Sequence, residues 1–482
     1  MNAMVQDVSA VPRLEPDAWR RGVLVAVRAG CRPVTLFATR QGDAVTLTAV
    51  LADGGALRVT RAVVDAHQGY HALTADLPAF HCFEREVHEQ TAVRMAGHPW
   101  LKPIRSERGG PMEAYPYYRI AGKEVHEVAV GPIHAGVIEP GSFRFACLGE
   151  QVLHLEIQLG YQHRGVERRL LEGDPKRLAP LVETIAGDSS VAHAWAYCAA
   201  LESLAGVQAP LEIELARAVA LELERVAMHL SGLAGLSADA GFSQGAAAYG
   251  RLRTTAINTT MALCGSRFGR GALRPGRAIP LSSDARAQAL RNIRLLQNDL
   301  PAVHACFLEG PGVRHRLEGV GVVAPADAQA LGLVGLAARA SGVALDLRHP
   351  VSRGAYQAVP LAPQGLVTGD CWARARLRIA EVDASLDWLS RCLRRPPLGE
   401  VERMACGPLR ANRLAIALVE GWRGEVVHCL QTGADGRLAH YKVQDPSLRN
   451  WMGLALAMRG NEISDFPLCN KSFDLSYCGN DL

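Results

Sequence analysis

The sequence of 482 residues has no Cys-x-x-Cys motif among its 12 cysteines, no long apolar run and almost no net charge. Zinc ribbons, thioredoxin-like redox pairs and self-contained iron–sulfur loops need closely spaced cysteines, so none of these is indicated. No segment approaches about 18 uninterrupted apolar residues, so no membrane-spanning helix is predicted. The 52 basic and 48 acidic residues nearly balance, which argues against a protein that coats nucleic acid.

Several catalytic and targeting motifs are also missing. There is no phosphate loop, no dinucleotide-binding Gly-x-Gly-x-x-Gly, no His-Glu-x-x-His and no Gly-x-Ser-x-Gly. The N-terminus lacks the charged start and apolar stretch of a secretory signal peptide. The scattered cysteines are therefore expected to be reduced, mostly buried thiols in a cytoplasmic protein.

The N-terminal part is predicted to be a small α+β domain over residues 1–105. Four segments rich in β-branched residues are separated by turn residues and are predicted strands: 22–30, 32–40, 43–53 and 56–64. A helix is predicted over 83–97, because Phe83 and Val87 share one face and acidic residues the other. A proline-, glycine- and charge-rich stretch follows, and residues 106–124 are a predicted linker.

Residues 125–482 are predicted to form a mainly α domain with short strands near 125–158 and 412–443. The long amphipathic helices are expected at residues 214–233, 282–310 and 373–395. Pro301 should kink or end the second of these helices. The first carries a polar stripe besides its apolar one, formed by Glu222, Arg225 and His229.

Five glycine-punctuated polar clusters follow one another along this part: residues 131–145, 160–170, 183–198, 420–428 and 465–482. Each alone has an ordinary structural interpretation, such as a hydrogen-bonded loop histidine for His134 or a helix-surface charge for Glu167. As an ordered set, the clusters resemble the large subunit of nickel–iron hydrogenases in its energy-converting, membrane-associated branch. That superfamily includes the 49-kDa-type quinone-site subunit of respiratory complex I. The stretches GPIHAGVIEPGSFRF, GYQHRGVE, ELERVAMHL, GDCWAR and DFPLCNKSFDLSYC carry the resemblance.

The N-terminal part carries a second resemblance. Residues 81–105 are similar to the end of the 30-kDa-type subunit of complex I, through the FERE and GHP sequences. In formate hydrogenlyase and hydrogenase-4 systems that subunit is fused to the large subunit. The whole chain therefore resembles the hydrogenase-4 component G type, which implies a 30-kDa-like α+β domain followed by a hydrogenase-large-subunit-like core.

The chain departs from the hydrogenase pattern at the metal site. A nickel–iron centre needs four thiolates, because soft sulfur donors hold and tune nickel and iron. The resemblance places Ala186, Ser189, Ser476 and Gly479 where those cysteines belong. No metal is therefore expected on this chain, and an active nickel–iron hydrogenase is the least favoured function.

Other polar residues remain in the corresponding clusters. Complex I subunits have also lost the cysteines and use the emptied cavity for a quinone headgroup, so the resemblance implies His163, Glu167 and Arg423 as candidate catalytic residues. A buried glutamate with a raised pKa, or a histidine, can relay a proton. Arg423 is always cationic and can orient an anionic or carbonyl ligand. The candidate cavity and quinone-binding residues are His134, Ser142 and His193.

The resemblance implies a subunit of a membrane-associated respiratory-type oxidoreductase complex, held at the inner membrane through its partners. The expected partners are a small subunit with a 4Fe–4S cluster and antiporter-like and other membrane subunits. No cofactor is expected on this chain itself, and quinone is the candidate acceptor, with its reduction coupled to ion translocation. Two hypotheses stay open: quinone-type electron transfer, and a catalytically silent scaffold or coupling subunit.

Overall fold

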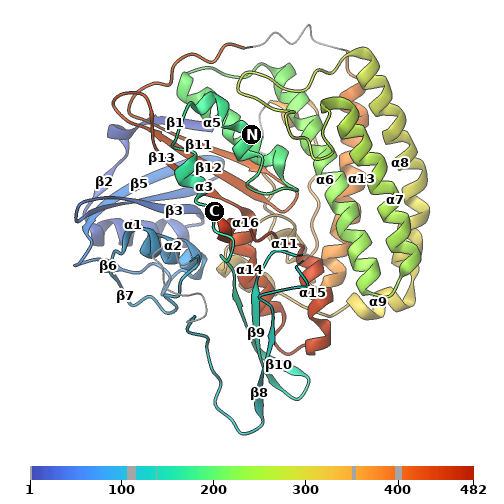
Figure 1. Ribbon diagram of the computed structural model, residues 1–482, viewed down its shortest axis with the longest axis horizontal. Helices are drawn as coiled ribbons and strands as arrows, with labels where there is room; N and C mark the ends of the chain where they lie inside the picture. Colours follow the sequence, from blue (N-terminus) through green and yellow to red (C-terminus); the bar gives the residue numbers. More distant parts are fainter. Residues whose placement is uncertain (1–2, 106–114, 137, 350–353, 397–403) are drawn as a thin grey trace.

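The structure is a computed structural model that describes residues 3–105, 115–136, 138–349, 354–396 and 404–482. Its sheets lie on one side and a bundle of long helices lies on the other (Figure 1). The first sheet, in the order β2-β5-β4-β3, contains β2 (Arg13–Leu14), β3 (Arg32–Gln41), β4 (Ala44–Asp53) and β5 (Ala56–Asp65). The second sheet, in the order β1-β11-β12-β13, contains β1 (Ala3–Asp7), β11 (Arg413–Glu420), β12 (Glu425–Thr432) and β13 (Leu438–Gln444).

The two sheets pack face to face because their strands alternate. In β4, Val45, Leu47 and Ala49 belong to the apolar cluster under the N-terminal helices. Val50 points the other way and packs in a second cluster with Leu414 and other residues of β11 and β12. This period of two buries both faces of the first sheet, one against helices and one against the second sheet.

One predicted strand is wrong. Residues 22–28 lie in a helix, α1 (Pro16–Arg28). The helix begins at a proline, whose missing N–H has no partner to lose in the first turn. Its buried residues, Trp19, Val23 and Leu24, lie on one face of the helix. Trp19 comes before the segment that was predicted to be a strand, so that segment alone did not show the helical spacing.

The other three predicted strands and the predicted helix are present. Three of the predicted strands are β3, β4 and β5, and the predicted helix is α2 (His81–Thr91). Phe83, Val87 and Thr91 are all buried on it. The helix ends earlier than predicted because Ala92 adopts a left-handed conformation, with φ of 57°.

The helical side is built from α6 (Leu211–Asp239), α7 (Ser243–Cys264), α8 (Ser283–Glu309) and α13 (Cys371–Arg394). All three predicted long helices are present. Ser282 caps α8 by accepting the Ala285 N–H at 3.2 Å. The helix continues through Pro301 rather than ending there. Its packing against α7 and α13 compensates for the backbone hydrogen bond that proline removes.

The short strands were also predicted correctly. The strands near 125–158 form a three-stranded sheet of β8 (Val125–Val130), β9 (Ser142–Leu148) and β10 (Gln151–Gln158), and those near 412–443 are β11, β12 and β13. The shorter helices between the sheets and the helical side are α3 (Val166–Arg169), α4 (Ala179–Val182), α5 (Ser190–Ala205), α11 (Gly335–Ala340), α14 (Pro446–Ala457), α15 (Phe466–Phe473) and α16 (Cys478–Asp481). The remaining short elements are β6 (Tyr70–His71), β7 (Met95–Ala96), α9 (Pro311–Leu317), α10 (Pro325–Ala330), α12 (Ala355–Ala358) and 3-10 turns at Val8–Ala10, Pro78–Phe80, Pro175–Arg177 and Ile463–Asp465.

The N-terminal part is tied to the C-terminal part through paired strands and buried side chains. Strand β1 pairs antiparallel with β11, so the first described residues belong to the second sheet. The buried guanidinium of Arg105 donates to the carboxylate of Glu86 at 2.6 Å. It also donates to the carbonyl oxygens of Gly479 and Asn480, both at 2.9 Å. The division into residues 1–105, 106–124 and 125–482 stays a prediction.

The two hydrogen bonds from Arg105 to the backbone of Gly479 and Asn480, here called the Arg105 clamp, should protect the C-terminal amides from exchange. In Arg105→Ala, we expect amide exchange in a peptide covering residues 479–482 to accelerate about tenfold or more, because two charge-assisted hydrogen bonds to that backbone are lost. Hydrogen–deuterium exchange read by mass spectrometry measures this. Exchange as slow as in the unaltered chain would contradict the clamp, and Arg94→Ala at an exposed position is the matched control.

Candidate functional site

A cavity of about 540 Å³ is lined by residues from several segments of the chain. The loop before α5 contributes Ala186 and Asp188, the turn between β11 and β12 contributes Arg423, and the C-terminal segment contributes Ser476 and Cys478. A volume of this size suits a small-molecule ligand. Segments almost 300 residues apart in the sequence thus form one site.

The cavity contains some of the residues predicted from the sequence. Ala186, Arg423 and Ser476 line it. Ser189 is buried beside it, with its N–H donating to the Ala186 carbonyl at 3.1 Å. Gly479 lies in the C-terminal segment with Ser476, and a Cβ added to it would lie 3.1 Å from the Cβ of Leu448. The four positions that lack the expected cysteines therefore lie in the two segments that meet at the cavity.

Arg423 is held rigidly at the cavity wall. Both of its terminal nitrogens bind the carboxylate oxygens of Asp188 at 2.7 Å, and its Nε donates to the Asp474 carbonyl at 2.5 Å. Its guanidinium lies 3.9 Å from the centre of the Trp422 ring. Burial lowers the pKa of Arg423, but the Asp188 carboxylate outweighs this effect and raises it, so the side chain stays cationic.

Two glycines fix the turn that carries Arg423. Gly335 has a φ of +63°, and a Cβ there would lie 2.1 Å from the Arg423 carbonyl oxygen. Gly424 approaches Gly335 just as closely, since a Cβ on Gly424 would lie 2.8 Å from the Gly335 backbone. Only glycine permits this contact between α11 and the turn.

A nickel–iron centre, which the fold family implies, does not fit the side chains at this site. Alanine and glycine offer no ligand, and neutral serine hydroxyls are poor donors for a soft metal. Cys478 lines the cavity, but burial and the nearby Asp445 raise the pKa of its thiol well above the usual range. Within the described ranges, no group of three or more His, Cys, Asp or Glu side chains is placed to hold a metal ion.

Glu167 lies outside this cavity, in an ion-pair cluster between the N- and C-terminal parts. It accepts from Lys442 Nζ and from the Val443 N–H, both at 2.9 Å. Burial raises the pKa of Glu167, but Lys442 and Arg105 outweigh it and the net pKa is lowered. A proton relay needs the opposite shift, so the relay role of Glu167 stays a prediction.

The other predicted residues also lie away from the cavity lining. His163 is exposed in the loop before α3. His134 is partly buried, and its Nε2 lies 2.8 Å from the Gly141 carbonyl. Ser142 is buried at the start of β9. Their proposed contacts with a ligand stay predictions.

His193 is fully buried on α5 and belongs to a chain of polar side chains. Its Nδ1 lies 3.0 Å from His428 Nε2, and its Nε2 lies 3.3 Å from a carboxylate oxygen of Asp445. His428 Nδ1 in turn lies 2.7 Å from the Tyr441 hydroxyl. Burial and the neighbouring His193 lower the pKa of His428 well below the usual range. This series of polar side chains ends at Asp445, close behind the cavity wall. A Cβ on Gly479, the residue next to the cavity-lining Cys478, would lie 3.2 Å from the Cβ of Asp445.

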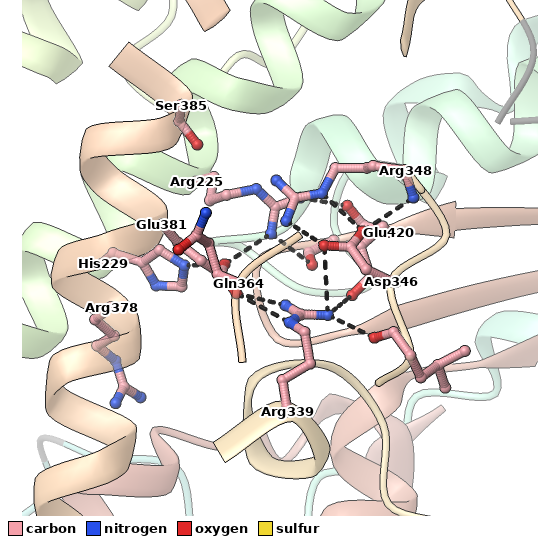
Figure 2. A network of polar contacts seen from close by, with 12 residues as sticks. Arg225, His229, Arg339, Asp346, Arg348, Gln364, Arg378, Glu381, Ser385 and Glu420 are labelled. Atoms are coloured by element: carbon pink, nitrogen blue, oxygen red, sulfur yellow. Dashed lines mark hydrogen bonds and ion pairs between the residues drawn. The ribbon is translucent and has the colours of Figure 1, made fainter. Parts of the chain in front are cut away.

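A second buried network lies between α6 and α13 (Figure 2). Arg339 binds Glu381 at 2.6 Å and Glu420 at 2.7 Å. Arg225 of the predicted polar stripe donates to the Glu420 carbonyl, and His229 Nε2 lies 2.8 Å from Glu381. The predicted polar stripe of α6 therefore faces a fully buried cluster rather than solvent.

His229 should make the protein sensitive to acid. Burial lowers its pKa to about 4, although Glu381 acts in the opposite direction. The folded state therefore keeps His229 neutral while the unfolded chain takes up a proton below about pH 6.5, so stability is lost as the pH falls from about 6.5 to 4. We expect His229→Gln to remove about 3 kcal/mol of that loss. Urea unfolding at pH 7 and pH 4.5 checks this, and an equal pH dependence in both proteins would contradict it.

Sequence reasoning missed several residues of the site. Asp188 stands inside a quoted cluster but has no distinctive spacing. Arg253 and Arg270 line the cavity from α7 and the loop after it, outside all five clusters. Only the folded chain brings them to the cavity, so no sequence signal identified them.

The chain matches the respiratory-chain NADH dehydrogenase 49-kDa subunit family over residues 239–411. It is 31% identical over 351 residues to the carbon monoxide-induced hydrogenase of Rhodospirillum rubrum, an alignment that covers 72% of this chain and 97% of that protein. The chain belongs to the complex I 49-kDa and energy-converting hydrogenase family. Hydrogenase-4 component G of Escherichia coli is 28% identical over 451 residues, which cover 88% of this chain and 78% of that protein.

The fold agrees with this membership. A chain of the membrane-bound sulfane sulfur reductase, an archaeal respiratory membrane complex, superposes with a TM-score of 0.69 and 24% identity. The match covers 76% of this chain and 100% of that one. The resemblance drawn from the motifs is confirmed, and the chain is a member of a family of subunits of membrane-bound oxidoreductase complexes. No helix in the described part of this family member is long and apolar enough to cross a bilayer.

Proposed function

We propose that this chain is the acceptor-site subunit of a membrane-associated oxidoreductase complex. One observation carries the proposal: the cavity holds a fixed cation, Arg423, at a site that lacks the four thiolates of a nickel–iron centre. Electrons arrive from a 4Fe–4S cluster in a small partner subunit, and the acceptor is of the quinone type. Antiporter-like and other membrane subunits hold the chain at the cytoplasmic face of the inner membrane and couple the reaction to ion translocation.

We assign the remaining predicted residues to the surroundings of this reaction. Arg423 orients the acceptor, because its guanidinium presents fixed donors to a carbonyl or an anionic oxygen. His163 serves proton supply on the side of the partner's cluster, and Glu167, which Lys442 keeps ionised, holds its ion-pair cluster together on that side. His134, Ser142 and His193 support the cavity from behind its lining. Residues 1–105 act as a 30-kDa-like domain that Arg105 ties to the C-terminal segment.

A catalytically silent scaffold or coupling subunit is the second candidate. It is favoured by the ion pairs of the candidate groups, since Arg423 donates to Asp188 and Asp474 and Glu167 accepts from Lys442 and Val443. Such pairing is typical of ion pairs that hold a fold together.

Filling the cavity separates the two candidates. In Ala186→Leu, we expect reduction of a short-chain quinone by the purified complex to fall at least tenfold, because the added side chain occupies the space for the acceptor. The matched control is Ala199→Leu on α5, which faces a separate cavity of about 390 Å³. Unchanged turnover in Ala186→Leu, in a complex of unchanged composition and melting temperature, would favour the scaffold.

A further inference from the structure

The cavity lining is rich in arginine. Four arginines line the cavity, but only three carboxylates do so. Asp188 is committed to Arg423, through two hydrogen bonds of 2.7 Å. The arginines are Arg164, Arg253, Arg270 and Arg423, and the acids are Glu139, Asp188 and Asp481.

Arg164 is also accounted for. Its guanidinium donates to the carbonyl oxygens of Thr184 and Ile185, at 2.9 and 3.1 Å. The carboxylate of Asp481 interacts electrostatically with Arg164 and accepts the Gln162 N–H at 3.0 Å. Arg164 and Arg423 are thus held in place by the protein itself.

Arg253 and Arg270 have no such partner. The Nε of Arg253 is buried, and nothing in the described part of the chain accepts its proton. Arg270 is exposed and lies over the loop before α5, with a terminal nitrogen 3.8 Å from where a Cβ on Gly187 would stand. A buried N–H donor without an acceptor is costly, so the Nε of Arg253 leaves room for an external acceptor, and the exposed guanidinium of Arg270 lies at the same cavity.

We infer that the cavity binds a small anion with two or more oxygen atoms, a carboxylate or an inorganic oxyanion, between Arg253 and Arg270. The planar guanidinium fork matches a pair of oxygens and binds such groups in a bidentate manner. A neutral quinone ring offers isolated carbonyls and leaves both charges uncompensated. The inference rests on the proposed function only in that both use the same cavity: the anion binds at Arg253 and Arg270, whereas the quinone-type acceptor is oriented by Arg423.

Sulfate is the probe for this site. Isothermal titration calorimetry of the purified complex, at an ionic strength held constant with chloride, should show saturable binding at one site per chain. We expect Arg253→Gln and Arg270→Gln each to weaken sulfate binding at least tenfold, with Arg253→Lys losing less than Arg253→Gln because it keeps the charge. Arg251→Gln is the matched control, because Arg251 lies on the same helix but pairs with Asp299 at the surface.

Each outcome decides the matter. Absence of saturable binding in the unaltered complex, or equal affinity in the glutamine variants with unchanged melting temperature, overturns the anion site. Loss of sulfate binding in a variant that still reduces quinone normally would separate the anion site from the acceptor reaction. Quinone reduction that never occurs, together with arginine-dependent sulfate binding, would overturn the proposed function and leave the anion site intact.

Discussion

Replacing Arg339 by Met should lower the free energy of unfolding by about 3–5 kcal/mol, because it leaves buried carboxylates without their cation. Arg339 binds Glu381 and Glu420, and all three side chains are at most 1% exposed. The remaining arginines of the network already have partners of their own, as Arg348 does in Asp346 at 2.6 Å (Figure 2). Denaturant unfolding followed by circular dichroism measures the loss.

An exposed ion pair provides the control for this prediction. Arg314 and Glu318 form an i,i+4 pair on α9, with side chains 59% and 48% exposed. Arg314→Met should change the free energy of unfolding by less than about 0.5 kcal/mol. Equal effects of the two substitutions would contradict a structural role for the buried network.

Arg423→Gln should slow quinone reduction by the complex about 100-fold, the size of effect that follows loss of one preorganised donor facing a developing negative charge. Glutamine keeps hydrogen-bonding capacity but removes the charge. Steady-state turnover with a short-chain quinone, measured in complexes of equal subunit composition, gives the result. Arg423→Lys should retain part of the activity, since it keeps the charge but not the two-pronged contact with Asp188.

The variant must be separated from simple misfolding. Asp188→Asn removes the same ion pair while keeping the cation, so it controls for the lost pairing. We expect it to slow turnover much less than Arg423→Gln, at a similar melting temperature. Equal losses in both variants would assign Arg423 to the fold rather than to the reaction.

Much of the fold was predictable because its periodicities are strong. Strands such as β4 alternate between two buried faces, and α6 repeats its apolar residues at helical spacing, so both were identified. The error over residues 22–28 arose where a helix carries three valines and one leucine, which also suit a strand. Pro301 was expected to kink or end a helix, and tertiary packing lets that helix continue through it.

The site was predictable only where motifs mark it. Ala186, Arg423 and Ser476 stand in ordered clusters and meet at the cavity. The counterion Asp188 and the unpaired Arg253 depend on the folded geometry, because nothing in their spacing shows that α7 faces the loop before α5. The same holds for the hydrogen-bonded side chains of His193, His428 and Tyr441, which come from separate helices and strands.

The central claim is that this site has exchanged nickel–iron chemistry for a metal-free ligand cavity. Its most direct test is the nickel content of the purified complex, measured by inductively coupled plasma mass spectrometry per mole of this chain. The side chains at Ala186, Ser189, Ser476 and Gly479 predict far less than one nickel per chain, even after growth in nickel-supplemented medium. One nickel per chain, lost when the cavity is filled by Ala186→Leu, would contradict the claim.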